Sequence, residues 1–232
     1  ADTAWYFITA DAGPGKRIQS QAESDLSASA TATTFTDYAF IENDEENLLI
    51  SGRKFVGNRM EVVNTHSFTF NFSNLTAGPH KLASNLLARG LSSTNFSVNV
   101  GNQSYTQQLN ALANLDYLST FARENETVFT FTGVAPSINV SVTKPSSSSI
   151  GWIDYLTINV QRNLALAGPA TGFRNQQLVG PGQVVQYEIS NSNAATRIWE
   201  VSNLYDVKLQ LATLSGSTLR FKQTADSLRE FV

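Results

Sequence analysis

The stretch Ser67-Phe68-Thr69-Phe70-Asn71-Phe72 decides the fold, because three phenylalanines alternate in it with three polar residues. Successive side chains of a β-strand point to opposite faces, so this stretch has one aromatic face and one polar face. The same period of two recurs in Phe96-Val98-Val100, Phe129-Phe131, Ile138-Val140-Val142, Leu156-Ile158-Val160, Val185-Tyr187-Ile189 and Val207-Leu209-Leu211. Half-buried strands of this kind form antiparallel sandwiches, since the strands of parallel sheets are apolar on both faces. The sequence therefore predicts an all-β fold.

Turn-forming residues divide the chain into segments of the length that such a fold requires. They lie at Gly13-Pro14-Gly15, Gly78-Pro79, Gly101-Asn102, Lys144-Pro145, Gly168-Pro169 and Gly180-Pro181-Gly182. We expect residues 35–162 to form a two-sheet sandwich and residues 163–232 to form a smaller β-rich segment. Residues 1–34 have no clear period and are expected to be a lead-in or an extended edge. The spacing of Tyr105, Leu109 and Leu112 favours one short helix within residues 105–118.

Composition excludes several classes of function. The 232 residues include 16 Lys+Arg and 19 Asp+Glu, a net charge of −3 without a basic cluster, which argues against nucleic-acid binding. No apolar run approaches the roughly 18–20 residues that span a bilayer. There is no cysteine, which excludes disulfides and a cysteine nucleophile within this sequence. The sequence begins abruptly at Ala1, so we expect any secretion signal to have been removed or left out of this sequence.

Two acidic features are candidates for chemistry. The run 42–47, Glu-Asn-Asp-Glu-Glu-Asn, has oxygen ligands of the kind that calcium prefers. Its spacing does not match the twelve-residue calcium loop, and a solvated turn is the simpler interpretation. Asp154 shares strand parity with Leu156 and Ile158, so it is expected to point inward and to need a partner. We expect that partner to be structural, either Arg53 or a cluster of backbone N–H groups, in preference to a metal or ligand.

The remaining candidates favour binding or packing over catalysis. Six aromatic residues could form a sugar-stacking platform, although core packing is the default for large rings: Trp5, Tyr38, Tyr117, Trp152, Tyr155 and Trp199. His66 and His80 lack a Ser or Asp at motif spacing and are expected to be surface residues. Six Asn-x-Ser/Thr triplets, at Asn71, Asn74, Asn95, Asn102, Asn125 and Asn139, are interpreted as a consequence of strands rich in Asn, Ser and Thr. We predict no catalytic, cofactor-binding or metal-binding residue, and the sequence leaves any binding residues unknown.

Several phrases, in order along residues 38–232, resemble one family. Residues 41–57 read Ile-Glu-Asn-Asp-Glu-Glu-Asn-Leu-Leu-Ile-Ser-Gly-Arg-Lys-Phe-Val-Gly. The later phrases are Gly151-Trp152-Ile153-Asp154-Tyr155, Gln161-Arg162-Asn163-Leu164, Ile198-Trp199-Glu200-Val201-Ser202, Leu219-Arg220-Phe221 and Ala225-Asp226-Ser227-Leu228-Arg229-Glu230-Phe231-Val232. Together they resemble the type IX secretion system sortases (the PorU family), which are gingipain-like cysteine peptidases. The family usually has His, Trp and Glu where this chain has Ile41, Phe55 and Asn58, which puts any interaction of those positions in doubt here.

The resemblance implies a non-catalytic, mostly β region that precedes the peptidase domain, whose catalytic Cys and His would lie downstream of Val232. It further implies an exported protein at the outer-membrane surface that processes secreted cargo of the type IX system. The Ile153-Asp154-Tyr155 strand also looks like galactose-binding-like jelly rolls, a likeness of architecture that does not fix function.

We therefore expect a jelly-roll-like antiparallel sandwich that serves as a non-catalytic accessory and positioning region of a cell-surface cysteine peptidase. Its expected partners are the downstream peptidase domain and secreted cargo or other secretion-system proteins, with no cofactor. The alternative is a carbohydrate-binding module of a secreted protein. A free-standing enzyme is the least favoured class, because the inventory of acids, bases and nucleophiles is so poor.

Overall fold

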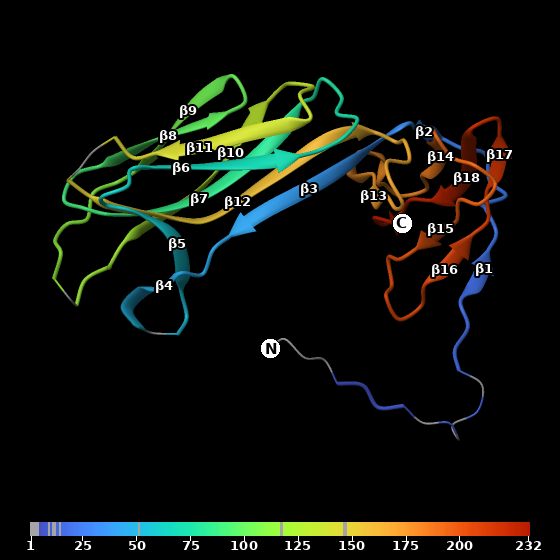
Figure 1. Cartoon of the computed structure of the whole chain (residues 1–232), viewed down its shortest axis with the longest axis horizontal. Helices are drawn as coiled ribbons and strands as arrows, with labels where there is room; N and C mark the ends of the chain where they lie inside the picture. Colours follow the sequence, from blue (N-terminus) through green and yellow to red (C-terminus); the bar gives the residue numbers. More distant parts are fainter. Residues whose placement is uncertain are drawn as a thin grey trace.

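The computed structural model describes residues 5–8, 10, 13, 15–50, 52–116, 118–145 and 148–232. In that part of the chain the secondary structure consists of strands and two single-turn 3₁₀ helices, η1 (Leu48–Ile50) and η2 (Gln176–Leu178). The strands form four sheets, arranged as two groups that lie side by side and each enclose a hydrophobic core (Figure 1). The prediction of an all-β fold is confirmed.

The larger group is an antiparallel sandwich. Its large sheet has the order β10 (Arg123–Phe131), β7 (His80–Arg89), β12 (Ile150–Asn163), β5 (Phe55–Met60) and β4 (Glu46–Asn47), and β3 (Thr34–Glu42) also pairs with β12. Its small sheet has the order β6 (Thr65–Asn71), β11 (Ser137–Thr143), β8 (Thr94–Val100) and β9 (Gln103–Leu109). The sandwich is jelly-roll-like, as the sequence predicted.

The alternating phenylalanines and aliphatic residues meet between these two sheets. Phe96, Val140 and Leu156 are completely buried there, and Phe70 is 4% exposed. Full burial of a large apolar side chain stabilises the folded state by about 1.5–3 kcal/mol relative to leaving it exposed. This shared core therefore dominates the stability of the sandwich.

The prediction of a helix within residues 105–118 is wrong, because residues 103–109 form strand β9. The apparent helical spacing of Tyr105 and Leu109 conceals Gln107, which lies between them on the same strand face and is 1% exposed. The Gln107 amide is hydrogen-bonded to the carbonyl oxygens of Ser84 (3.0 Å) and Asn125 (2.7 Å), so a polar residue continues the buried row. The strand's period of two was therefore present in the sequence, but the polar side chain of Gln107 concealed it.

The smaller group, called the C-terminal unit below, contains two sheets. The first has the order β1 (Gln19–Gln21), β16 (Lys208–Gln210), β15 (Ile198–Glu200), β19 (Glu230–Phe231) and β13 (Phe173–Arg174). The second has the order β17 (Thr213–Ser215), β18 (Thr218–Thr224), β14 (Val184–Ile189) and β2 (Ala30–Ala32). β1 and β2 come from the N-terminal part of the chain and add in parallel to β16 and β14.

Stacked aromatic rings form the core of the C-terminal unit. The rings of Tyr187 and Phe221 are stacked with centroids 5.0 Å apart, and those of Phe173 and Phe231 are stacked at 5.1 Å. Burial raises the pKa of Tyr187 to about 12. This core is distinct from the core of the sandwich, which explains why the strand pattern of the sequence continues past residue 163. No helix among the described residues is long and apolar enough to cross a membrane.

One irregularity in the large sheet determines which side chains face outward. The pairing of β12 with β7 shifts register between Ile153, which is opposite Leu86, and Tyr155, which is opposite Asn85. Asp154 is therefore the extra residue of a β-bulge. Because a bulge inserts one residue, it changes strand parity, and this is why Asp154 lies beside Asn85 and not in the core.

Candidate functional site

The face of the large sheet that points away from the small sheet is called the open face below. At one end loops cover it, over a small core of Leu48, Val56, Leu87 and Trp152. At the other end the C-terminal unit contacts β3 through β13. In Figure 1 the β4–β5 segment and the C-terminal unit both project to this side of the sheet. The middle of the open face lies between them and is exposed.

Strand register arranges the middle of the open face in three rows across β3, β12, β7 and β10. The first row is Glu42, Tyr155, Asn85 and Glu126; the second is Phe40, Thr157, Ala83 and Val128; the third is Tyr38, Asn159, Lys81 and Thr130. The outer rows are mainly polar, whereas the middle row is mainly apolar.

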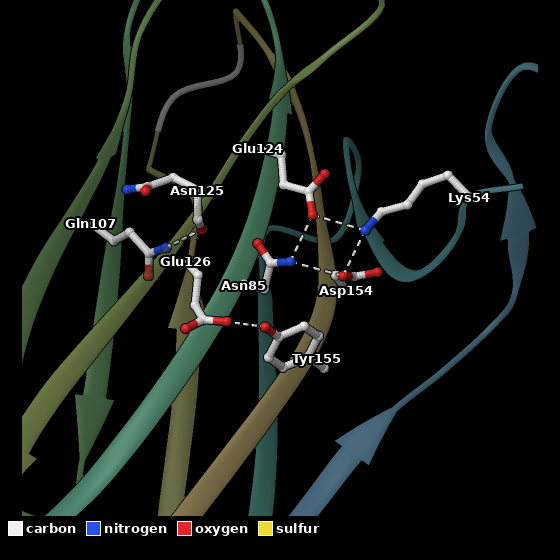
Figure 2. Close-up of polar contacts among 8 residues, drawn as sticks. All are labelled: Lys54, Asn85, Gln107, Glu124, Asn125, Glu126, Asp154 and Tyr155. Carbon is white, nitrogen blue, oxygen red and sulfur yellow. Dashed lines mark hydrogen bonds and ion pairs between the residues drawn. The ribbon is translucent and has the colours of Figure 1, made fainter.

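A polar cluster of Lys54, Asn85, Glu124 and Asp154 adjoins the first row (Figure 2). The Lys54 ammonium lies 2.8 Å from Glu124 Oε1 and 2.8 Å from Asp154 Oδ2. The Asn85 amide donates to the same two oxygens, at 2.7 Å and 2.9 Å. The side chain of Asp154 is only 8% exposed, whereas that of Lys54 is 36% exposed. Each carboxylate therefore accepts from a charged and a neutral donor.

These contacts change the pKa values of the cluster. Burial alone would lower the pKa of Lys54, but hydrogen bonds to Asp154 and Glu124 raise it above its ordinary value. Burial alone would raise the pKa of Glu124, but hydrogen bonds from Lys54 and Asn85 lower it. Both shifts favour the ionised pair at neutral pH. A carboxylate and an ammonium that stabilise each other's charged forms are suited to structural pairing and poorly suited to proton transfer.

The first row continues beyond the cluster through Tyr155 and Glu126. The Tyr155 hydroxyl donates a hydrogen bond to Glu126 Oε2 (Figure 2). This bond, assisted by partial burial, raises the pKa of Tyr155 to about 12. The phenol is therefore fixed in its protonated form on the open face at physiological pH.

The structure assigns Asp154 a different partner from the one we expected. The expectation that a buried Asp154 is structurally paired is confirmed, but Lys54 and Asn85 hold it. The expectation that it points inward with Leu156 is wrong, because of the bulge in β12. A bulge adds a single residue without a composition signature, so strand parity alone could not detect it.

The acidic run binds protein donors in this structure. Glu46 accepts from Trp152 Nε1 at 2.8 Å and pairs with Arg59 at 3.1 Å, and Glu45 accepts from the backbone N–H of Asn58 at 2.9 Å. Among the residues that the structure describes, no group of three or more His, Asp or Glu side chains is placed to hold a metal ion. These carboxylates therefore fasten the β4–β5 segment to the sheet.

The two histidines differ in their surroundings. His66 is half-buried, whereas the prediction that His80 lies at the surface is wrong, since it is 1% exposed. His80 Nδ1 accepts from the backbone N–H of Gln161 at 3.2 Å, and Nε2 lies 2.9 Å from the carbonyl oxygen of Gly133. These two contacts join both ring nitrogens of His80 to backbone groups and give the side chain a structural role.

The six aromatic residues considered for a platform do not come together. Trp152 is buried at 1% exposure, Trp5 is 86% exposed, and Trp199 lies in the C-terminal unit. Tyr117 lies outside the described residues. Tyr38 and Tyr155 do share the open face, together with Phe40, which is 63% exposed and which the sequence did not single out.

The C-terminal unit contains a cavity of about 480 Å³. Apolar side chains form most of its wall, including Leu166, Phe173, Ile189 and Ile198. Arg197 is the one charged side chain among the described residues that line it. This lining can bind apolar groups but offers no acid–base pair for catalysis.

Comparison with solved structures gives a likeness of architecture to a region of one larger protein. No model of a protein family matches the chain, and no curated protein sequence matches it. Among solved structures, a crystal structure of dimeric latent PorU from Porphyromonas gingivalis matches with a TM-score of 0.79 and 16% identity. The match covers 92% of this chain and 21% of the PorU chain, so the chain spans about a fifth of the protein it resembles.

Two carbohydrate-binding modules match only part of the chain. A CBM36-1 domain of a xylanase from the hindgut metagenome of Trinervitermes trinervoides matches 53% of the chain and 96% of that domain at 13% identity, with a TM-score of 0.36. CBM35 from Cellvibrio japonicus Abf62 matches 55% of the chain and 86% of that domain at 13% identity, with a TM-score of 0.35. Scores this low carry no argument about the present chain. The likeness that extends over nearly the whole chain is the first: this protein has the fold of a region of PorU.

Proposed function

We propose that this chain is a non-catalytic accessory region of a larger exported cysteine peptidase related to PorU, held at the outer-membrane surface. In this proposal it positions the peptidase domain and contacts secreted cargo of the type IX system or its other components. The observation that carries the proposal is the shared fold across 92% of the chain, which corresponds to only 21% of the PorU chain.

The chemistry of the chain supports a non-catalytic role. It contains no cysteine, so it cannot itself provide the nucleophile of a cysteine peptidase. Its candidate groups are engaged in structural contacts: His80 bonds to backbone groups, and Asp154 and Glu124 bond to Lys54 and Asn85. The ordered phrases along residues 38–232 support the same assignment from the sequence side.

The test is a deletion in the parent protein. A parent that lacks residues 35–162 but is exported normally should lose most of its processing of cargo. The matched control carries Val63→Ala, at a side chain that is 56% exposed and lies outside the open face, and should retain full processing. Full processing by the deletion protein, with normal folding and location, would contradict the proposal.

A second candidate is carbohydrate binding, and one observation favours it. The exposed Phe40 and Val128 lie in one row of the open face, between rows that carry hydroxyl, amide and carboxylate groups. Apolar centres with a few polar groups beside them are typical of small-ligand sites. Binding of the purified chain to a broad glycan array tests this candidate, and a negative array would remove it.

A further inference from the structure

The two outer faces of the sandwich have different chemistry. The outer face of the small sheet consists of uncharged polar side chains, such as Ser67, Thr69, Asn139 and Ser141. Cross-strand contacts such as Thr69 Oγ1 to Asn139 Oδ1, at 2.8 Å, join its side chains in pairs. Two of the six Asn-x-Ser/Thr triplets, those at Asn95 and Asn139, lie wholly on strands of this sheet, since residues i and i+2 of a strand share one face. It has the character of a surface that faces water.

The open face instead exposes apolar groups. Phe40 is 63% exposed and Val128 is 54% exposed, and the smaller side chains of Thr157 and Ala83 continue the row between them. An exposed apolar patch with a polar rim marks an interaction site more often than a merely solvated surface. We therefore assign binding to the open face and not to the outer face of the small sheet.

The size of the patch indicates a small ligand. Neighbouring strands lie about 4.8 Å apart and residues i and i+2 about 6.8 Å apart, so the positions of four strands and three rows cover roughly 400 Å². A stable protein–protein interface needs about 800 Å² on each partner. The bounded area, between the loop-covered end of the sheet and the C-terminal unit, is too small to hold a second folded protein by itself.

The flanking rows indicate the chemistry of that ligand. On one side lie the Tyr155 phenol and the Glu126 carboxylate, and on the other lie the Asn159 amide and the Lys81 ammonium. These groups supply hydrogen-bond donors and acceptors on both sides of an apolar strip. The two flanking rows carry two carboxylates, of Glu42 and Glu126, and one ammonium, of Lys81, so their net charge is small and does not favour a strongly charged ligand. A pyranose ring has this complementary form, with C–H groups on its faces and hydroxyls around its edge.

We propose that the open face is a glycan-binding site. In this site sugar rings lie on Phe40 and Val128 while their hydroxyls reach Tyr155 and Glu126 on one side and Asn159 on the other. The inference rests on the second candidate function and names the site and ligand class for it. The polar cluster at Lys54 keeps the first row in place.

The experiment has two steps. A broad glycan array first identifies the neutral oligosaccharide that the purified chain binds most tightly, and a calorimetric titration then measures its affinity. Phe40→Ala should weaken binding about tenfold, equivalent to about 1.4 kcal/mol, and Asn159→Ala should weaken it measurably. Two control variants carry substitutions at exposed residues outside the open face. They are Val63→Ala, at a side chain that is 56% exposed, and Thr69→Ala. Both should bind as the unchanged protein does, and all four variants should keep its circular dichroism spectrum.

Each contrary result has a distinct meaning. A glycan that binds equally well to Phe40→Ala and Asn159→Ala would overturn this site while leaving carbohydrate binding intact. A negative array would overturn both, and would leave the accessory role in a peptidase untouched. A synthetic peptide of residues 3–10 serves as a polypeptide probe: if it bound in a Phe40-dependent way while no glycan bound, the ligand class would be wrong.

Discussion

Substitution of Lys54 should destabilise the sandwich more than substitution of Asp154, although the two groups form one ion pair. Lys54→Met leaves the carboxylate of Asp154, which is 8% exposed, beside Glu124 without a cation. Removing one partner of a buried pair costs about 3–5 kcal/mol. Because the Lys54 side chain is 36% exposed and Asp154 keeps its bond to Asn85, we discount this to about 2–3 kcal/mol.

Asp154→Asn should cost only about 1 kcal/mol, since it removes a charge-assisted bond but leaves Lys54 paired with Glu124 and partly in water. The double variant of Lys54→Met and Asp154→Asn should be more stable than the two single effects predict, by about 1 kcal/mol, because no unpaired buried carboxylate remains. Lys81→Met, at an exposed lysine, is the control and should change stability by less than about 0.5 kcal/mol.

The pH dependence of the unfolding free energy is a second test of the same cluster. The pKa of Glu124 is lowered in the folded protein, so its stabilising effect is present above its ordinary value of 4.5 and is lost as pH falls through the folded value. In Lys54→Met the hydrogen bond from the ammonium to Glu124 is absent, so the Glu124 carboxylate accepts a proton at higher pH. The difference in unfolding free energy between this variant and the unchanged protein should therefore shrink between pH 7 and pH 4.

Urea unfolding followed by tryptophan fluorescence at both pH values measures all of these effects, and Trp152 is a buried reporter in the same sheet. Additive single effects, or a loss below about 0.5 kcal/mol for Lys54→Met, would refute the reasoning that the ammonium compensates two carboxylates.

Three further predictions follow from other contacts. Tyr155→Phe removes the phenol that Glu126 holds protonated, so ultraviolet titration should lose one tyrosine that ionises near pH 12; an unchanged titration curve would contradict the assignment. Trp152→Phe loses the bond to Glu46 and buried area, and should lower the unfolding free energy by about 2–3 kcal/mol in urea; a loss under about 1 kcal/mol would show that loop fastening is unimportant. Leu156→Ala, at a completely buried site, should cost about 2–5 kcal/mol in the same assay, and near-neutral behaviour would contradict the shared core.

The sequence predicted the fold class well because the period of two is a direct consequence of strand geometry. Phe70, Phe96 and Val140 lie in the core as the alternation requires. It failed where a local feature changes parity or hides it. The bulge at Asp154 turned that carboxylate outward, and the buried amide of Gln107 disguised strand β9 as a helix.

The candidate site could be predicted only in part. Asp154 was singled out as a carboxylate in need of a partner, but its partners are Asn85, on β7, and Lys54, just before β5, and only the sheet order brings these strands beside β12. Phe40 was missed for a related reason, since its neighbours on the open face come from strands far away in the sequence. Register across a sheet is a long-range property, and alternation within one strand carries no information about it.

The central proposal, that this chain works as part of a larger surface peptidase, is tested most directly by the mass and location of the native polypeptide. An antibody raised against this 25.3 kDa chain should detect, in fractionated cells, a polypeptide several times larger in the outer-membrane fraction. A band of about the size of this chain, free in the medium, would contradict the proposal and would make carbohydrate binding the leading function.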